Sequence, residues 1–150
     1  MSDSTRTVVH LLRHGEVYNP EGVLYGRLPG YVLSDLGHEM AQRAADALRD
    51  HDLTHVIASP MERAQQTAAP IAASHGLAIG TEPLIIEADN IFEGQRVSVG
   101  DGVLKQPRTW RHLWNPFRPS WGEPYDEVAA RMGAAVDIAR ERARGHEAVL

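Results

Sequence analysis

The chain is organised around residues 8–16, which read VVHLLRHGE. The apolar, partly β-branched start of this stretch predicts a buried strand, and Gly15 allows the backbone to turn sharply after it. Arg13 and His14 therefore lie where a strand passes into a loop, at the sheet edge where α/β proteins bind ligands. A guanidinium matches phosphate oxygens, and imidazole is a nucleophile that is largely neutral at physiological pH. The pair indicates a phosphate that Arg13 holds and His14 attacks.

The composition is that of one globular domain. The chain has 150 residues, 43% hydrophobic and 23% charged, which is enough for a sizeable core. No apolar run approaches the roughly 20 residues that span a bilayer, and the polar residues 1–7 do not resemble a signal peptide. The absence of cysteine excludes disulfides, thiolate catalysis and cysteine-based zinc sites. We therefore predict a cytoplasmic protein with no membrane partner.

The charge balance bears on the binding partners. The formal net charge of −5 argues against a nucleic-acid partner. A phosphate pocket in such a chain must concentrate positive charge locally. The sequence does not determine the oligomeric state, and a homodimer is compatible with it.

Strand and helix patterns alternate along the chain. Apolar residues at helical spacing predict helices that begin at Ser34, at Ser59 and near residues 123–124. Short apolar runs predict strands at residues 55–58, 77–79 and 147–150, and a further brief run at residues 84–86. This alternation predicts an α/β fold: a three-layer α/β/α sandwich with a mostly parallel central sheet.

The second helix carries another candidate phosphate ligand. Ser59 is expected to cap it, with Pro60 at the first helical position and Glu62 closing a capping box. Arg63 then lies in the first turn of a helix that begins at a strand's carboxyl end. Free backbone N–H groups and the positive end of the helix dipole favour an anion there. We predict that Arg63 is a second phosphate-binding arginine, and that Pro70 kinks the helix.

Two irregular segments are candidates for shaping the site. Residues 17–30 are rich in proline and glycine and predict a loop that borders the site. Arg27 in that loop is equally compatible with an anion contact and with a solvated surface position. Residues 96–120 are predicted to form an irregular excursion with a short helix near 109–114, whose tryptophans are expected to serve as lid or core packing.

A metal-binding alternative is weaker. Strand geometry could place His10, His14 and Glu16 on one side, but no recurrent ligand spacing supports a metal site. The six other histidines are scattered and are expected at the surface.

Several motifs together resemble one family. Arg13-His14-Gly15-Glu16 is followed by a Ser, Arg-Ala and Thr-Ala pattern in residues 59–68, read SPMERAQQTA. Tyr25-Gly26-Arg27, Glu87 with residues 92–94, and Gly122-Glu123-Pro124 follow the same family's order. The chain resembles the histidine phosphatase superfamily, also called the phosphoglycerate mutase-like family, from about Val8 to Leu150. The resemblance implies the phosphoglycerate mutase-like fold.

The resemblance also implies roles. His14 would accept the phosphoryl group as phosphohistidine, and Glu87 would act as general acid and base. The phosphoryl oxygens would be bound by Arg13, Arg63 and Asn19, and the substrate by a loop containing Gly26 and Arg27. No metal or organic cofactor is implied.

Two departures from the family pattern are visible. Val17 stands where the family usually has Ser or Thr, and Asn19 comes one residue early. The family's second catalytic histidine follows a strand, and this sequence ends within the corresponding strand, at Leu150. We therefore predict that residues 1–150 form a single domain that lacks its C-terminal part.

The sequence favours a phosphomonoester hydrolase that acts through phosphohistidine on a small phosphorylated metabolite. A phosphoglycerate mutase is the alternative within the fold, because it uses the same chemistry but transfers the group to a second hydroxyl. A non-catalytic phosphate-binding protein of the same fold is the alternative from another class.

Overall fold

The computed structural model describes residues 6–96 and 121–150. Within them a 4-stranded parallel sheet contains β1 (Val8–His10), β2 (Leu53–Ala58), β3 (Ile79–Thr81) and β4 (Glu147–Val149). The strand order is β1-β4-β2-β3, so the last strand lies between the first and the second. The expectations of a parallel sheet and of a strand in residues 147–150 are confirmed.

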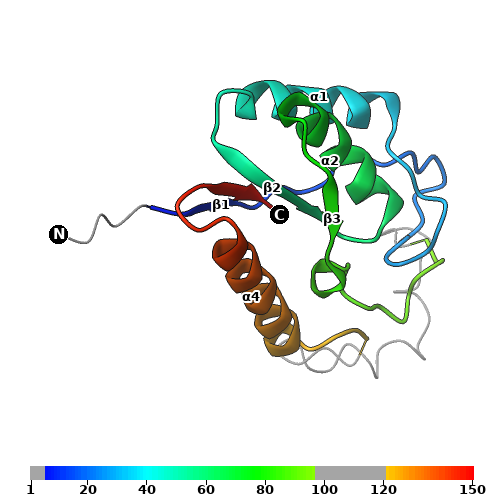
Figure 1. Cartoon of the computed structure of the whole chain (residues 1–150). Coiled ribbons are helices and arrows are strands. Elements are labelled where there is room, and N and C mark those ends of the chain that lie inside the picture. Colours follow the sequence, from blue (N-terminus) through cyan, green and yellow to red (C-terminus); the bar gives the residue numbers. More distant parts are fainter. Residues whose placement is uncertain (1–5, 97–120) are drawn as a thin grey trace.

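Helices cover both faces of this sheet (Figure 1). Helices α1 (Asp35–Leu48) and α2 (Glu62–His75) pack against each other on one face. Helix α4 (Tyr125–Arg142) lies on the other face and contacts β1, β4 and β2. A single 3-10 turn, η1 (Pro83–Ile85), follows β3 and contacts α4. The predicted three-layer α/β/α sandwich is confirmed.

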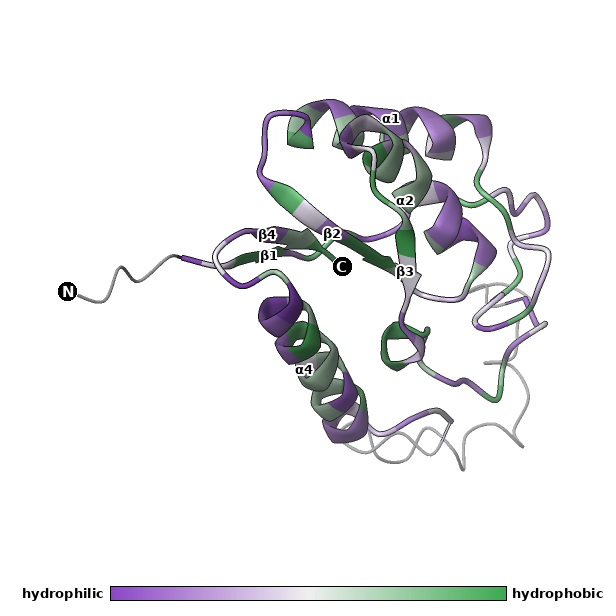
Figure 2. Ribbon diagram, viewed as in Figure 1, coloured by the Kyte–Doolittle hydropathy of each residue, from purple (hydrophilic) through white to green (hydrophobic). Residues whose placement is uncertain are grey.

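Two apolar cores follow from the alternation of side chains along the strands. Val56 and Val149 pack with Ile71 in the core beneath α1 and α2. Their neighbours Ile57 and Ala148 point to the opposite face and pack with Ala139 and other small residues of α4. Figure 2 shows the largely green strands between helices that combine green and purple turns.

The sequence predicts the N-cap of α1 correctly but not that of α2. Ser34 caps α1 as expected, because its Oγ accepts a hydrogen bond from the Gly37 N–H at 3.0 Å. The predicted capping of α2 is wrong: its N-cap is Met61, and the helix begins at Glu62. The Glu62 carboxylate instead accepts a hydrogen bond from the Gly30 N–H at 2.9 Å. A contact with a distant loop thus replaces the local capping box.

Other boundaries shift because tertiary contacts override local propensity. Strand β1 is half-buried rather than buried, since among the described residues it pairs only with β4. Leu11 and Leu12 lie beyond the strand and are 64% and 39% exposed. Strand β3 begins at Ile79, whereas the predicted strand begins at residue 77. The brief apolar run at residues 84–86 overlaps η1. Helix α2 continues through Pro70 to its C-cap at Gly76.

Two further points concern the whole chain. Residues 97–120 of the predicted excursion at 96–120, with its short helix near 109–114, lie outside the described residues. In the part of the chain that the structure describes, no helix has the length and apolar character that a membrane span requires.

Candidate active site

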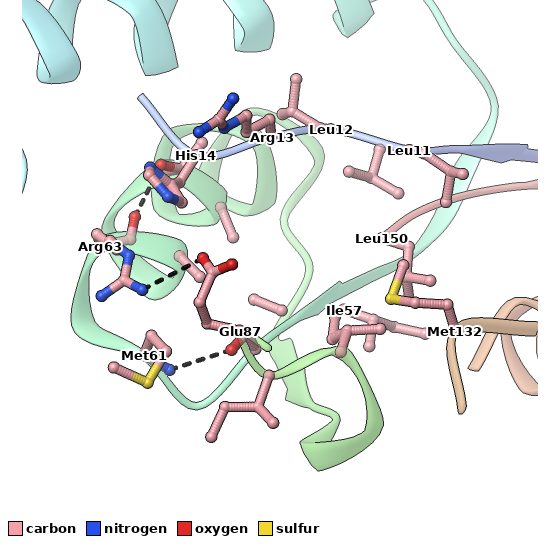
Figure 3. Close-up of a pocket in the computed structure, with 18 of the residues that line it drawn as sticks. Leu11, Leu12, Arg13, His14, Ile57, Met61, Arg63, Glu87, Met132 and Leu150 are labelled. Atoms are coloured by element: carbon pink, nitrogen blue, oxygen red, sulfur yellow. Dashed lines mark hydrogen bonds and ion pairs between the residues drawn. The ribbon is translucent and has the colours of Figure 1, made fainter. Parts of the chain in front are cut away.

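A cavity of about 550 Å³ lies at the carboxyl edge of the sheet. Its walls come from segments distant in sequence: the turn after β1, the start of α2, the segment after η1, and α4. Figure 3 shows His14, Arg63 and Glu87 at one end, whereas Leu11, Ile57 and Met132 line the other. The parallel strands all end at this edge, so the topology brings the polar residues that follow them together.

The hydrogen bonding of His14 determines its tautomer. Its Nδ1 lies 2.8 Å from the Gly15 carbonyl oxygen. A carbonyl can only accept, so Nδ1 carries the proton, and the neutral tautomer compatible with this contact has its lone pair on Nε2. His14 is half-buried and lines the cavity. This is the tautomer that an imidazole attacking through Nε2 requires.

Close backbone packing fixes the turn that carries His14. A Cβ on Gly15 would lie 2.5 Å from the Gly37 carbonyl oxygen, so only glycine fits there. The Gly15 N–H donates to Thr67 Oγ1 at 3.1 Å, and that hydroxyl donates to the Arg63 carbonyl at 2.7 Å. Thr67 therefore joins the turn after β1 to the first turn of α2. The positions of His14 and Arg63 are coupled through this one hydroxyl.

Arg63 is a buried cation with spare donors. Its side chain is 1% exposed, its Nη2 donates to the Gly26 carbonyl at 2.7 Å, and its guanidinium lies 4.8 Å from the Tyr25 ring centroid. Its Nε and Nη1 have no hydrogen-bond partner among the described residues. Each buried unpaired donor costs roughly 1–3 kcal/mol. An anion bound in the cavity is the partner that these donors fit.

Glu87 supplies the carboxylate of the site. It lines the cavity just after η1, and its Oε2 lies 3.6 Å from Arg63 Nη2 (Figure 3). Its side chain is 46% exposed, so water reaches it. A carboxylate that is both beside a buried cation and open to water can exchange protons with a group bound in the cavity.

A network around Glu123 holds the segment that carries Glu87. Arg131 donates to Glu123 from Nε at 2.7 Å and from Nη2 at 2.9 Å, and Arg27 Nη2 donates to it at 3.1 Å. Arg131 Nη1 also donates to the Leu84 carbonyl at 2.5 Å, and Arg27 Nε donates to the Glu87 carbonyl at 2.7 Å. Both arginines therefore bind backbone carbonyls within residues 84–87, and the Glu123 carboxylate orients both guanidinium groups.

Electrostatics at Glu123 agree with this geometry. Hydrogen bonding from Arg131 lowers the pKa of Glu123 from its ordinary value of 4.5. Partial burial opposes that shift, and the charges of Arg131 and Arg27 add to it. Glu123 is thus held as an anion between two cations.

The structure brings together most of the predicted site residues. The main cavity is lined by four of them: Arg13, His14, Arg63 and Glu87. Gly26 lines an adjoining cavity of about 340 Å³, and Arg13 and Glu87 line both cavities.

Two predicted residues lie elsewhere. Asn19 lines neither cavity, and its amide exchanges hydrogen bonds with the Val23 backbone at 2.8 and 3.1 Å. Arg27 also lines neither, because its guanidinium is turned to Glu123 and to the Glu87 backbone. The roles predicted for both residues as ligands of the substrate stay predictions.

The weaker metal alternative does not assemble in the described residues. His14 is bonded to Gly15, and the Glu16 carboxylate accepts from Ser34 Oγ at 2.5 Å. His10 is bonded to Glu147 instead.

Sequence reasoning left three positioning residues without a role. Thr67 and Glu123 belong to the family motifs at residues 59–68 and 122–124, and this membership is the sequence feature that indicates a role for them. Arg131 carries no local signal, since it reads as one of several polar residues on α4.

Comparison with known proteins supports the resemblance. The sequence model of the histidine phosphatase superfamily (branch 1) matches residues 9–150. The Rv0525 protein of Mycobacterium tuberculosis (strain ATCC 25618 / H37Rv) is 61% identical over 143 residues, which cover 95% of this chain and 71% of Rv0525. The probable phosphoglycerate mutase GpmB of Yersinia pestis (strain Pestoides F) is 30% identical over 148 residues, with 95% and 67% covered.

A solved structure agrees with these sequence relatives. The alpha-ribazole phosphatase from Shigella flexneri superposes with a TM-score of 0.69 at 26% identity, over 94% of this chain and 71% of that one. The family match covers nearly the whole chain, and Arg13, His14, Arg63 and Glu87 from its motifs line one cavity. The chain is therefore an enzyme of the histidine phosphatase superfamily, branch 1.

Proposed function

We propose that the chain is a phosphomonoester phosphatase that works through a phosphohistidine on His14. The observation that carries the proposal is the pairing of Arg63 with His14 at one end of the cavity (Figure 3). Arg63 offers two buried N–H donors that have no partner in residues 6–96 and 121–150, and His14 offers a free Nε2 lone pair. A phosphoryl group bound there satisfies the donors and meets the nucleophile.

The first step transfers the phosphoryl group to the enzyme. The Nε2 lone pair attacks phosphorus while the bond from phosphorus to the ester oxygen breaks, and Glu87, which enters this step protonated, donates its proton to the leaving oxygen. Arg63 and Arg13 stabilise charge on the remaining phosphoryl oxygens, where phosphoryl transfer needs it most.

The second step returns the enzyme to its starting state. Water attacks phosphorus, Glu87 accepts a proton from that water, and the bond between nitrogen and phosphorus breaks to release inorganic phosphate. The exposure of Glu87 supports hydrolysis, because water reaches the acid–base group directly.

Phosphoglycerate mutase activity is the second candidate. The 30% identity to the probable phosphoglycerate mutase GpmB supports it. A mutase must shield its phosphoenzyme from water, so the openness around Glu87 favours the phosphatase. Release of phosphate measured beside conversion of 3- to 2-phosphoglycerate separates the two.

The proposal includes the setting of the reaction. The substrate is a small phosphorylated metabolite, the reaction itself requires neither metal nor organic cofactor, and the enzyme acts in the cytoplasm without a nucleic-acid or membrane partner. A homodimer is compatible with this assignment.

The decisive experiment screens phosphorylated metabolites with the wild type, His14→Ala and, as a matched control, His38→Ala on the exposed surface of α1. We expect turnover by the wild type and the control, and an acid-labile, base-stable phosphoenzyme that only His14→Ala lacks. Retention of more than about a thousandth of the activity in His14→Ala would overturn the mechanism. Phosphate binding without any turnover or phosphoenzyme would instead support a non-catalytic binding protein.

A further inference from the structure

A second cluster of ligand-type side chains lies away from the cavity. In the described part of the chain, His10, His51 and Glu147 form the one group of three metal-ligand residues whose donor atoms all lie within 4.8 Å of one another. None of the three lines either cavity. The cluster therefore needs an explanation that the phosphoryl chemistry does not provide.

The three side chains converge from different parts of the chain. His10 ends β1, Glu147 begins β4, and His51 lies between α1 and β2. Strand β1 pairs with β4, and Leu53 of β2 pairs with Glu147, so the sheet brings these segments together. Val9 packs toward α4, so His10 points to the opposite face, which carries α1 and α2.

Both imidazoles form a hydrogen bond with the same carboxylate oxygen. Glu147 Oε2 lies 2.5 Å from His10 Nε2 and 2.8 Å from His51 Nδ1. The centroids of the two rings lie 5.1 Å apart, and the ring planes make an angle of 87°. The side chains are 27%, 41% and 23% exposed for His10, His51 and Glu147, so an ion can enter from solvent.

We propose that His10, His51 and Glu147 bind one divalent transition-metal ion of the zinc class. Two imidazole nitrogens and one carboxylate oxygen suit Zn²⁺ and Co²⁺, with water in the remaining position. Ligand atoms about 2.1 Å from a tetrahedral ion lie roughly 3.4 Å apart. The two imidazole nitrogens, now 2.5 and 2.8 Å from Glu147 Oε2, must therefore each move away from that oxygen by less than about 1 Å. The ion would replace the protons through which both imidazoles now bond to Glu147 Oε2.

The site would act as a clamp on the sheet. Strand β1 has only β4 as a strand partner among the described residues, and the turn after it carries Arg13 and His14. An ion held by His10 and Glu147 ties β1 to β4, and His51 ties both to the segment before β2. Binding to the folded state alone would stabilise the fold by mass action.

Within residues 6–96 and 121–150, the other ion pair of a histidine with a carboxylate lacks this convergence. His146 Nδ1 lies 2.7 Å from Asp52 Oδ2, but these side chains are 52% and 69% exposed and form a group of two. This surface pair thus has fewer ligand-type side chains than the cluster, and its side chains are more exposed to solvent.

The test is titration of the untagged, chelator-stripped chain with Zn²⁺ alone, followed by calorimetry. We expect one ion per chain, and a loss of affinity of at least about tenfold in His51→Gln and in Glu147→Gln. His38→Gln, an exposed histidine on α1, is the matched control and should bind as the wild type does. Co²⁺ should give visible absorption bands of a four-coordinate site in the wild type that His51→Gln loses.

Thermal unfolding gives a second readout that does not depend on catalysis. With Zn²⁺ at 100 times its Kd, the Tm should rise by about 5–10 °C in the wild type and by much less in His51→Gln. The proposal is overturned by failure to bind Zn²⁺ at about 1 mM, or by equal affinity in the wild type and both cluster variants. It is also overturned if His14→Ala, rather than the cluster variants, removes binding, because the ion would then lie in the catalytic cavity.

Discussion

The substitution Glu123→Gln tests whether one carboxylate organises the segment that carries Glu87. Glu123 accepts two hydrogen bonds from Arg131 and one from Arg27, and these arginines hold the carbonyls of Leu84 and Glu87. Glutamine has the same shape but no charge, and it turns an N–H₂ group toward the guanidinium donors. We therefore expect both arginines to lose their alignment.

The structure sets the size of the effect. Glu123 and Arg131 are each only 15% exposed, so solvent screens their pairing poorly. Hydrogen bonds to charged groups contribute about 1.5–3 kcal/mol, and removal of one partner of a fully buried pair costs about 3–5 kcal/mol. For this partly exposed network we expect the free energy of unfolding to fall by about 2–3 kcal/mol. The corresponding fall in Tm is roughly 4–12 °C for a domain of this size.

Urea unfolding of the wild type and the variant measures this loss, and kcat and KM measured in parallel report on the site. We expect kcat to fall more than KM rises, because Glu123 positions the backbone at Glu87 rather than binding substrate. Glu141→Gln is the matched control, since Glu141 pairs with Arg144 at an exposed position and should cost less than about 0.5 kcal/mol. An equal loss in both variants would refute the reasoning.

Three further predictions concern the same site. Arg63→Ala should reduce kcat/KM by at least about 100-fold and weaken protection of the fold by inorganic phosphate, whereas a weaker KM with unchanged kcat would make Arg63 a ground-state anchor. Glu87→Gln should slow alkyl phosphates far more than an aryl phosphate, whose leaving group needs little protonation, and equal losses would indicate a structural carboxylate. Because the pKa of Glu123 is lowered in the folded state, its contribution to stability is complete above about pH 4.5 and is lost as the pH falls through the folded pKa. Unfolding of Glu123→Gln should therefore depend less on pH below 4.5 than that of the wild type, and parallel curves would contradict this.

Much of the fold follows from local sequence, since periodic apolar residues bury one face of each element. The alternation of strands and helices predicted the three-layer sandwich. Ser34 predicted the start of α1 because the hydrogen bond that caps the helix joins residues only three positions apart, Ser34 and Gly37. Arg13, His14 and Arg63 follow β1 and β2, and Glu87 follows η1 after β3, so all four lie at the edge where the parallel strands end.

Contacts between distant segments decided what the sequence did not predict. Glu62 bonds to Gly30 rather than closing a capping box, and this contact joins residues 32 positions apart. Arg27 could have met an anion or solvent, and the fold turned it to Glu123, 96 residues away. His10 and His51 meet only because β1 and β2 flank β4, which begins at Glu147. Local sequence determined the elements and the candidate chemistry, because propensity, capping and spacing act over a few residues. Only tertiary structure decided which charges meet, because that depends on strand order and on loop paths that no short stretch encodes.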